Sequence, residues 1–209
     1  MLFYFLWVCM SEYGNYRKLI KCDLEDTIEF FSNKKKSERE IWVLKEFLSY
    51  FPPIDLPIKP SKDEPYDVFC GDYGFQIKEI YPDGRKRDDE YKKMVKSFPK
   101  STPSTSYSHE HIPLEQSLPR VIEDIEKYRT TKYFDLTSKI DVLVYLNLPN
   151  TTYTSDSPLL DFEELKYWRS VSLVSNNCAL VLSCQNKTNK ILFPWCGQLK
   201  IKENWDKHH

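Results

Sequence analysis

The sequence predicts an α/β protein of the α+β type, in which helices flank a mixed sheet. Three observations support this prediction. Apolar runs on both sides of a Gly-Asp-Tyr-Gly turn at residues 71–74 are typical of a β-hairpin. Apolar side chains at helical spacing follow Ser117 and predict an amphipathic helix to about Thr131. The nearly continuous apolar run at residues 140–146 predicts a central strand that is covered on both faces.

Length and composition describe one domain with a hydrophobic core. The chain has 209 residues, of which 41% are hydrophobic and 29% charged, and its formal net charge is −1. A nucleic-acid-binding protein with so little net charge must gather its basic residues on one face. We expect a single domain over residues 23–196, an N-terminal extension over residues 1–22 and a C-terminal tail over residues 197–209.

The cysteines and the first residues bear on the cellular setting. The 6 cysteines contain no C-x-x-C pair and no metal-type spacing, so a reducing cytoplasm is the expected location. Residues 1–10 are apolar but too short to span a bilayer, and no membrane partner is expected. Met10 is an alternative start to Met1.

Two consecutive helices are predicted between Asp23 and about Phe51. They are separated near Ser32 and Asn33, where a side-chain cap can end one helix and begin the next. The second helix carries an apolar stripe, and extending this stripe four residues back reaches Glu40, which places a carboxylate on the core-facing side. Alternatively, Glu40 occurs there because the helix dipole favours a carboxylate in the first turns.

A proline-rich, extended connector at residues 52–64 leads into the hairpin. If residues 72–73 form its tip, Asp67 faces Lys78 across the two strands. Alternation along the strands then places Asp67, Gln76 and Lys78 on one face, with the apolar side chains on the other.

The rest of the chain alternates helices, loops and strands, which completes the mixed sheet. We expect a short charged helix that follows residues 85–87 and includes Lys92, Lys93 and Lys96, a mobile loop at 98–113, a polar loop at 148–158, a helix near 160–169, and strands near 170–174, 178–184 and 190–194.

The polar face of the hairpin is the candidate site. A carboxylate, an amide oxygen and an ammonium on one surface suit a metal ion beside a phosphate group. The simpler alternative for Asp67 and Lys78 is a cross-strand ion pair on a solvated sheet.

The order of these features resembles a known nuclease pattern. An acidic residue on a first helix, then Asp67, Gln-x-Lys on the next strand, an amphipathic helix and a buried strand resemble the PD-(D/E)xK, restriction-endonuclease-like superfamily over residues 34–147. Within it, the chain is most similar to an uncharacterised domain family named for a proposed endonuclease activity. The similar stretches are Ser37-Glu38-Arg39-Glu40, Tyr66-Asp67-Val68, Lys127-Tyr128 and Trp168-Arg169-Ser170-Val171-Ser172-Leu173.

The resemblance implies a restriction-endonuclease-like core and a metal-dependent endonuclease that cleaves phosphodiester bonds in nucleic acid, with DNA as the expected partner. Asp67, Gln76 and Glu40 would ligate Mg²⁺, with Mn²⁺ as an alternative ion, and Glu38 is the reserve for Glu40. Lys78 would be the catalytic lysine, so that the catalytic set is Asp67, Gln76, Lys78 and Glu40.

Two features depart from the superfamily pattern. Tyr66 is interposed between Pro65 and Asp67, and the neutral Gln76 stands where an acidic ligand is usual. An alternative function is therefore a catalytically inactive nuclease-fold protein that binds nucleic acid or another protein. A further alternative is an unrelated α/β protein with a structural ion pair.

Weaker signals concern the surface. Basic runs before the Glu40 helix and after the Gln76 strand bracket the candidate site, so they are candidate phosphate contacts, although such runs are often merely solvated. The cluster at residues 167–169 can either stack on nucleic acid or belong to the core. A homodimer is compatible with the sequence. The candidate phosphate contacts are Lys35, Lys36, Arg85, Lys86 and Arg87.

Overall fold

The computed structural model describes residues 22, 25–30, 32–81, 114–147, 163–175, 177–185 and 189–202. The chain divides into two compact units, one of Met1–Arg39 with Gly84–Ser106 and one of Glu40–Asp83 with Tyr107–His209. The segments expected at 85–96, 98–113 and 148–158, which include Arg85, Lys86 and Arg87, lie outside the described residues.

In the first unit, the predicted break between two helices is present. Residues 25–30 are helical, and the 3-10 turn η1 (Asn33–Lys35) leads directly into α2 (Lys36–Leu48). The Ser32 side chain forms no cap, contrary to the prediction. Instead, Arg39 Nη1 donates hydrogen bonds of 3.2 Å to the carbonyl oxygens of Phe30 and Ser32, which ties the two helical segments together.

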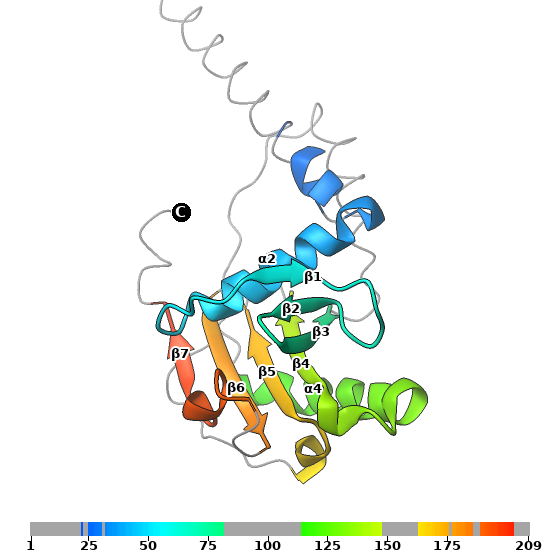
Figure 1. Ribbon diagram of the computed structural model, residues 1–209, viewed down its shortest axis with the longest axis vertical. Coiled ribbons are helices and arrows are strands. Elements are labelled where there is room, and N and C mark those ends of the chain that lie inside the picture. Colours follow the sequence, from blue (N-terminus) through cyan, green and yellow to red (C-terminus); the bar gives the residue numbers. More distant parts are fainter. Residues whose placement is uncertain are drawn as a thin grey trace, which may run out of the picture. The chain divides into compact units, whose positions relative to one another are not determined.

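The second unit is built on one mixed sheet of seven strands in the order β1-β2-β3-β4-β5-β6-β7. Neighbouring strands are antiparallel except for β3 with β4 and β4 with β5, which are parallel (Figure 1). The predicted α/β class, a mixed sheet flanked by helices, is therefore confirmed. The strands are β1 (Ile58–Pro60), β2 (Val68–Cys70), β3 (Tyr73–Ile80), β4 (Asp141–Leu146), β5 (Ser170–Val174), β6 (Cys178–Cys184) and β7 (Leu199–Ile201).

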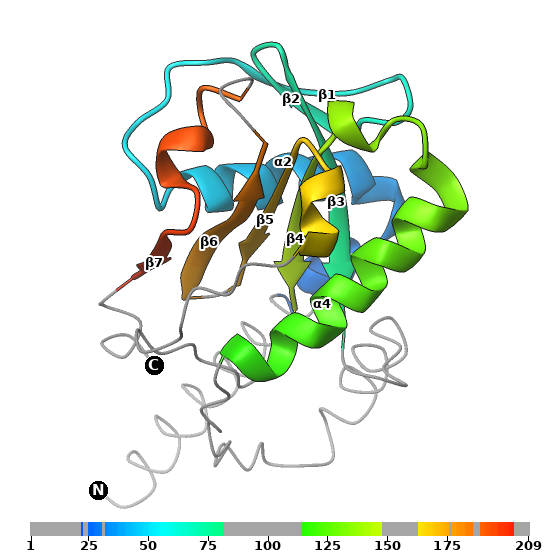
Figure 2. The ribbon, with the colours of Figure 1, turned by 90° about the horizontal axis from the view of Figure 1, so that it is seen from below.

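In the described part of the chain, one long helix covers each face of the sheet. From Glu40 onward, α2 packs on one face, and α4 (Leu114–Tyr128) crosses the other face (Figure 2). Every residue of β4 is buried, which confirms the predicted central strand. The predicted stripe of α2 is also confirmed, since Leu44 and Phe47 are fully buried and Glu40 is only 7% exposed.

The hairpin formed by β2 and β3 has the predicted faces but not the predicted register. Cys70 pairs with Tyr73 across the turn, so the tip is Gly71-Asp72, because Gly71 supplies a positive φ of 57° at the first turn position. The expectation that Asp67 faces Lys78 is wrong. The pairing is shifted by two positions, and a shift by an even number leaves each side chain on its predicted face.

The region after β6 also differs from the prediction. The strand expected at 190–194 is absent, and turns lead into the 3-10 turn η6 (Phe193–Trp195). The cause is local: Asn189 Oδ1 accepts hydrogen bonds from the backbone N–H groups of Ile191 and Leu192, which turns the chain away from an extended path. The last strand is instead β7, within the segment expected to be a tail.

Two further helices are shorter or differently placed than expected. The helix predicted near 160–169 is described only as the 3-10 turn η4 (Glu163–Tyr167), and α4 begins at Leu114, before Ser117. A π-helical turn, η2 (Arg129–Tyr133), continues α4 and brings the chain back toward β4 through the 3-10 turn η3 (Thr137–Lys139). None of the helices in the described ranges is both long and apolar enough to cross a membrane.

Candidate functional site

Asp67 and Gln76 meet on the α4 face of the sheet. Asp67 immediately precedes β2, and its backbone N–H donates to the Phe75 carbonyl at 2.9 Å, which continues the hairpin pairing by one residue. Its Oδ2 atom accepts a hydrogen bond from Gln76 Nε2 and one of 2.9 Å from the Ile77 backbone N–H. Since a carboxylate can only accept, the bond fixes which end of the Gln76 amide points at Asp67.

Lys78 lies on the same face, two residues beyond Gln76. Its Nζ atom sits 4.5 Å from the ring centroid of Tyr128, the last residue of α4. The Tyr128 ring also packs edge-on against Tyr133, at 5.1 Å between centroids. A cation over an aromatic face is attracted by the ring quadrupole, so the end of α4 helps to hold the lysine beside Asp67 and Gln76.

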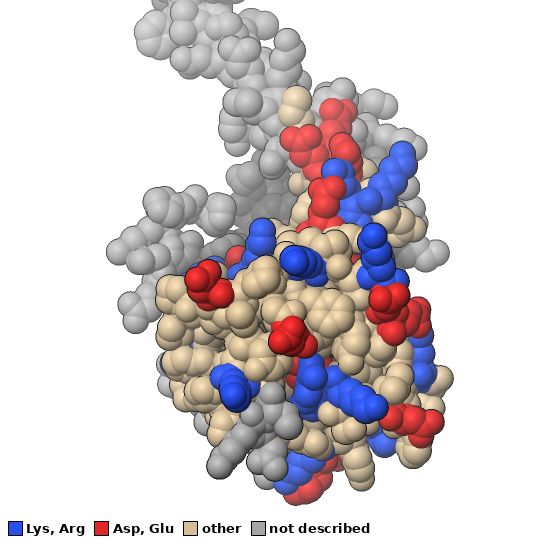
Figure 3. Space-filling view, viewed as in Figure 1, with Lys and Arg blue, Asp and Glu red and all other residues tan. Residues whose placement is uncertain are grey.

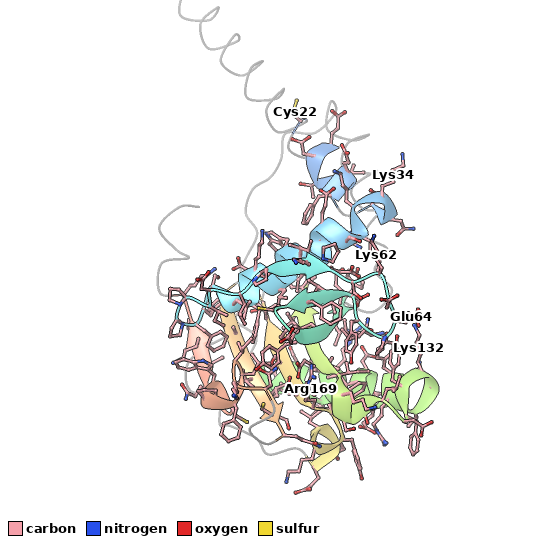
Figure 4. All side chains as sticks on the ribbon, in the orientation of Figure 1. Cys22, Lys34, Lys62, Glu64, Lys132 and Arg169 are labelled. Carbon is pink, nitrogen blue, oxygen red and sulfur yellow. The ribbon has the colours of Figure 1, made fainter. Side chains whose placement is uncertain are left out.

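The surroundings of Tyr128 perturb its hydroxyl group. Burial is the main reason that the pKa of Tyr128 is raised, followed by the hydrogen bond and charge of Tyr133 and by the negative charges of Asp67 and Glu64. The Tyr128 hydroxyl is therefore neutral at physiological pH. Glu64 and Lys132 lie next to each other at the rim of this site, 3.4 Å apart (Figure 4).

The predicted fourth member of the site, Glu40, comes from the helix on the other face of the sheet. Glu40 belongs to α2, which packs against the apolar face formed by Val68, Cys70 and Phe75, whereas Asp67 and its neighbours lie on the α4 face. A side chain from α2 can approach Asp67 only around the edge of β3, which β2 leaves unpaired beyond Phe75. Helical periodicity predicted the burial of Glu40, but it carries no information about which face of the sheet α2 covers.

The residues present fit a Mg²⁺ ion only with a sparse set of protein ligands. Asp67 offers a carboxylate, and Gln76 offers its amide oxygen while its nitrogen bonds Asp67. Among the described residues, no three His, Cys, Asp or Glu side chains come together as metal ligands. Mg²⁺ commonly retains several waters and takes one or two protein carboxylates, so this pair suits weak binding completed by water and substrate phosphate.

Of the five predicted phosphate contacts, Lys35 and Lys36 lie within the described residues. Lys35 pairs with Glu38 at 2.8 Å, and the Glu38 carboxylate raises the pKa of Lys35. Glu38, the reserve ligand, is therefore used in this exposed pair. On the described part of the face in Figure 3, basic and acidic side chains are interspersed.

A second polar cluster, which the sequence did not predict, lies at the beginning of β4. Asp141 is fully buried and accepts hydrogen bonds from Arg169 Nε at 2.9 Å, Ser170 Oγ at 2.7 Å and Asn189 Nδ2 at 2.8 Å. Arg169 Nη2 also bonds Asp141 Oδ2 at 2.5 Å and the Gly74 carbonyl at 3.2 Å. Burial raises the pKa of Asp141, while Arg169 opposes that shift. All the hydrogen bonds that this buried carboxylate accepts come from the protein's own side chains, at the start of the strand beside β3, which indicates a structural role.

The aromatic cluster at residues 167–169 divides among three environments. Trp168 is fully buried in the α4-side core, and Arg169 is held in the Asp141 cluster. Tyr167 is 56% exposed. Only Tyr167 of the three is therefore available to an outside partner.

The comparisons with known proteins agree with this fold and assign a family. Residues 12–201 match the family model described as "Putative endonuclease, protein of unknown function (DUF1780)". The chain belongs to this family. The family match spans all seven strands of the sheet and both long helices, and it includes every residue of the candidate site.

One solved structure shares the fold. It is a protein of unknown function from Pseudomonas aeruginosa strain PAO1, described as a member of the monooxygenase superfamily. The likeness has a TM-score of 0.60 at 20% sequence identity and covers 90% of this chain and 95% of that one. At this identity the likeness shows the fold alone. No curated protein matches the chain.

Proposed function

We propose that this protein is a metal-dependent endonuclease of the PD-(D/E)xK type, whose site consists of Asp67, Gln76 and Lys78. The observation that supports this most directly is that the structure brings these three side chains to one sheet face beside Tyr128. The order of α2, the β1-β2-β3 meander, α4 and the parallel strand β4 matches the order that the nuclease resemblance implies. The family description points to the same activity.

Each residue has a distinct part in this proposal. A bound divalent cation would offset charge on the scissile phosphate and acidify a water molecule. Asp67 and the Gln76 amide oxygen would position that ion. Lys78, held over the Tyr128 ring, would place a positive charge beside the phosphate and stabilise the additional negative charge of the transition state. Glu40 remains a predicted ligand that would have to reach the site around the edge of β3.

The proposal is tested by nicking of supercoiled plasmid DNA in Mg²⁺ and in Mn²⁺. Asp67→Ala and Lys78→Ala should each reduce the rate by about a hundredfold or more, the usual cost of losing one charge-stabilising group. Asp72→Ala, an exposed acid at the tip of the same hairpin, and Lys59→Ala, an exposed lysine on β1, are matched controls and should nick at the wild-type rate. If the wild type and all four variants give the same rate, the proposal is wrong.

A second function is favoured by one specific observation. Gln76 donates a hydrogen bond to Asp67, so this carboxylate already has a partner without a bound cation. A nuclease-fold protein that has lost catalysis and only binds nucleic acid would show the same arrangement. Binding that is unchanged by EDTA, together with no nicking by the wild type, would select this alternative.

A further inference from the structure

Two aromatic rings on the surface near the end of α4 are unusually exposed. Phe134 is 66% exposed and Tyr167 is 56% exposed, whereas the other exposed large hydrophobic side chains of the described residues reach at most 42%. Large apolar side chains that stay in water together indicate a binding surface. We refer to Phe134, Tyr167 and the Arg129 side chain between them as the ring patch.

The ring patch is held in place before any partner arrives. Arg129 Cζ lies 4.4 Å from the centroid of the Tyr167 ring and 5.7 Å from that of Phe134. The guanidinium is itself fixed by Glu126, through Nε at 3.0 Å and Nη2 at 2.8 Å, and its side chain is only 17% exposed. Little rotamer entropy remains to be lost when a flat ligand stacks on these rings.

The patch is adjacent in the chain to the residues that contact Lys78. Arg129 follows Tyr128, whose ring carries the Lys78 ammonium at 4.5 Å, and Phe134 follows Tyr133, which packs against Tyr128. Tyr167 comes from η4, which packs against α4. Side chains of consecutive helical residues point in different directions, so a strand whose phosphate lies at Lys78 would reach the rings by passing around the end of α4.

The charges around the patch favour a base over a phosphate. Arg129 pairs with Glu126, Lys132 with Glu64 and Lys166 with Glu163, so the local positive charge is largely matched. The apolar surface is also small compared with the roughly 800 Å² that each partner buries in a stable protein complex. Base stacking on aromatic rings needs neither a net positive field nor a large area.

We infer that the ring patch stacks an unpaired base of a single-stranded nucleic acid that lies across the Asp67 and Lys78 site. The inference rests on the proposed function for the path of the strand, and it specifies the substrate class: single-stranded or locally unpaired nucleic acid in preference to an intact duplex. Bases in a duplex are already stacked on each other and cannot reach the rings without unpairing.

The test measures binding rather than cleavage. A fluorescein-labelled oligothymidylate and a duplex of the same length are titrated with the full chain in EDTA, and binding is followed by fluorescence anisotropy. Phe134→Ala and Tyr167→Ala should each weaken binding of the oligothymidylate by about fivefold to a hundredfold, the range for one base stacked on one ring. Phe193→Ala removes a ring that is 42% exposed on η6 and is the matched control, expected to bind as the wild type does.

The outcomes separate this inference from the proposed function. Ring-dependent binding of the oligothymidylate without any nicking would support the ring patch and refute the nuclease. Nicking that depends on Asp67 while Phe134→Ala and Tyr167→Ala bind normally would refute the ring patch alone. The inference is also overturned if the wild type does not bind the oligothymidylate, or if both ring variants weaken duplex binding equally, because that would indicate backbone contacts or a protein-docking role.

Discussion

Asp67 and Gln76 stand opposite each other across the β2-β3 hairpin, and Gln76 Nε2 donates a hydrogen bond to Asp67 Oδ2. The Ile77 backbone N–H donates to the same oxygen at 2.9 Å. A glutamate at position 76 would have no donor for Asp67 at neutral pH and would place a second negative charge beside it. The neutral amide is therefore matched to Asp67 in the absence of a cation.

Gln76→Glu should make the stability of the protein depend on metal. Without a divalent ion, the like-charge pair and the lost hydrogen bond should destabilise the fold by about 1–3 kcal/mol. A shift of 1 kcal/mol corresponds to a change of roughly 2–4 °C in Tm for a chain of this size. Mg²⁺ should restore the loss, because one more unit of negative charge near the ion strengthens binding by about 1–4 kcal/mol at 4 Å.

The matched control is Gln76→Leu, which removes the hydrogen bond without adding a charge. It should lower Tm in EDTA, and Mg²⁺ should not restore the loss, because leucine offers the ion no oxygen. Calorimetric scans of wild type and both variants in the two buffers provide the comparison. A Gln76→Glu protein whose Tm does not respond to Mg²⁺ or Mn²⁺ would contradict a metal site at this position.

The two faces of the hairpin could be predicted from the sequence because side chains alternate with a period of two. An error of two positions in the register leaves each side chain on the same face. The register itself could not be predicted, because it depends on which glycine takes the positive φ: Gly71 does so, and the expected tip was one residue too late. Glu40 shows a related limit. Helical periodicity predicted that it is buried, but the periodicity of a single helix does not say which face of the sheet that helix covers.

The Asp141 cluster could not be predicted from the sequence for a different reason. Its members come from the beginning of β4, the beginning of β5 and the turn before η6, so no local spacing joins them. An aspartate at the start of an apolar run, such as Asp141, reads as a strand boundary. One indirect signal was present. The predicted strand has no polar face, so the charge at its first residue must find hydrogen-bond partners within the core.

Tyr128 is predicted to act through Lys78. Tyr128→Leu removes the ring that lies 4.5 Å from the Lys78 ammonium, so the lysine should lose its fixed position. An ammonium over a partly buried ring is worth about 0.5–2 kcal/mol, which predicts a drop in the nicking rate of roughly twofold to thirtyfold. Tyr128→Phe keeps the ring and should retain most of the rate.

Single-turnover rates at saturating DNA measure this effect on the chemical step. A merely structural role would lower the rate of both variants in proportion to their loss of Tm. Equal rates for Tyr128→Leu and Tyr128→Phe, with equal Tm values, would show that the ring does not position Lys78.

The Asp141 cluster is predicted to be essential for folding but replaceable as a unit. Asp141→Ala leaves Arg169 without its buried partner and should cost about 3–5 kcal/mol, and Arg169→Ala should cost a similar amount. Asp141→Leu combined with Arg169→Met removes both charges and should be less destabilised than either single variant. Urea unfolding of the four proteins gives the free energies. A double variant as unstable as the sum of the singles would show that the two residues act independently.

The raised pKa of the buried Cys178 thiol should make the fold less stable at alkaline pH. Burial raises its pKa to about 12, whereas a cysteine in the unfolded chain titrates near about 8.5. Between these values the folded state keeps a proton that the unfolded state releases, so the free energy of unfolding falls as pH rises. The expected slope from this one group is about 1.4 kcal/mol per pH unit above roughly pH 8.5. The half-buried Cys184 thiol, whose pKa is also raised to about 12, mainly by desolvation, adds to the decline.

Cys178→Ala should therefore flatten the alkaline decline, because it removes one titrating group while keeping a small apolar side chain in β6. The control is Val181→Ala, which deletes methyl groups from an equally buried site of the same strand and carries no proton. Its curve should be displaced downward by a constant amount at every pH, as expected for a cavity. Unfolding free energies measured in urea at intervals above pH 8 distinguish the two: if both variants run parallel to the wild type, the Cys178 thiol does not keep its proton in the fold.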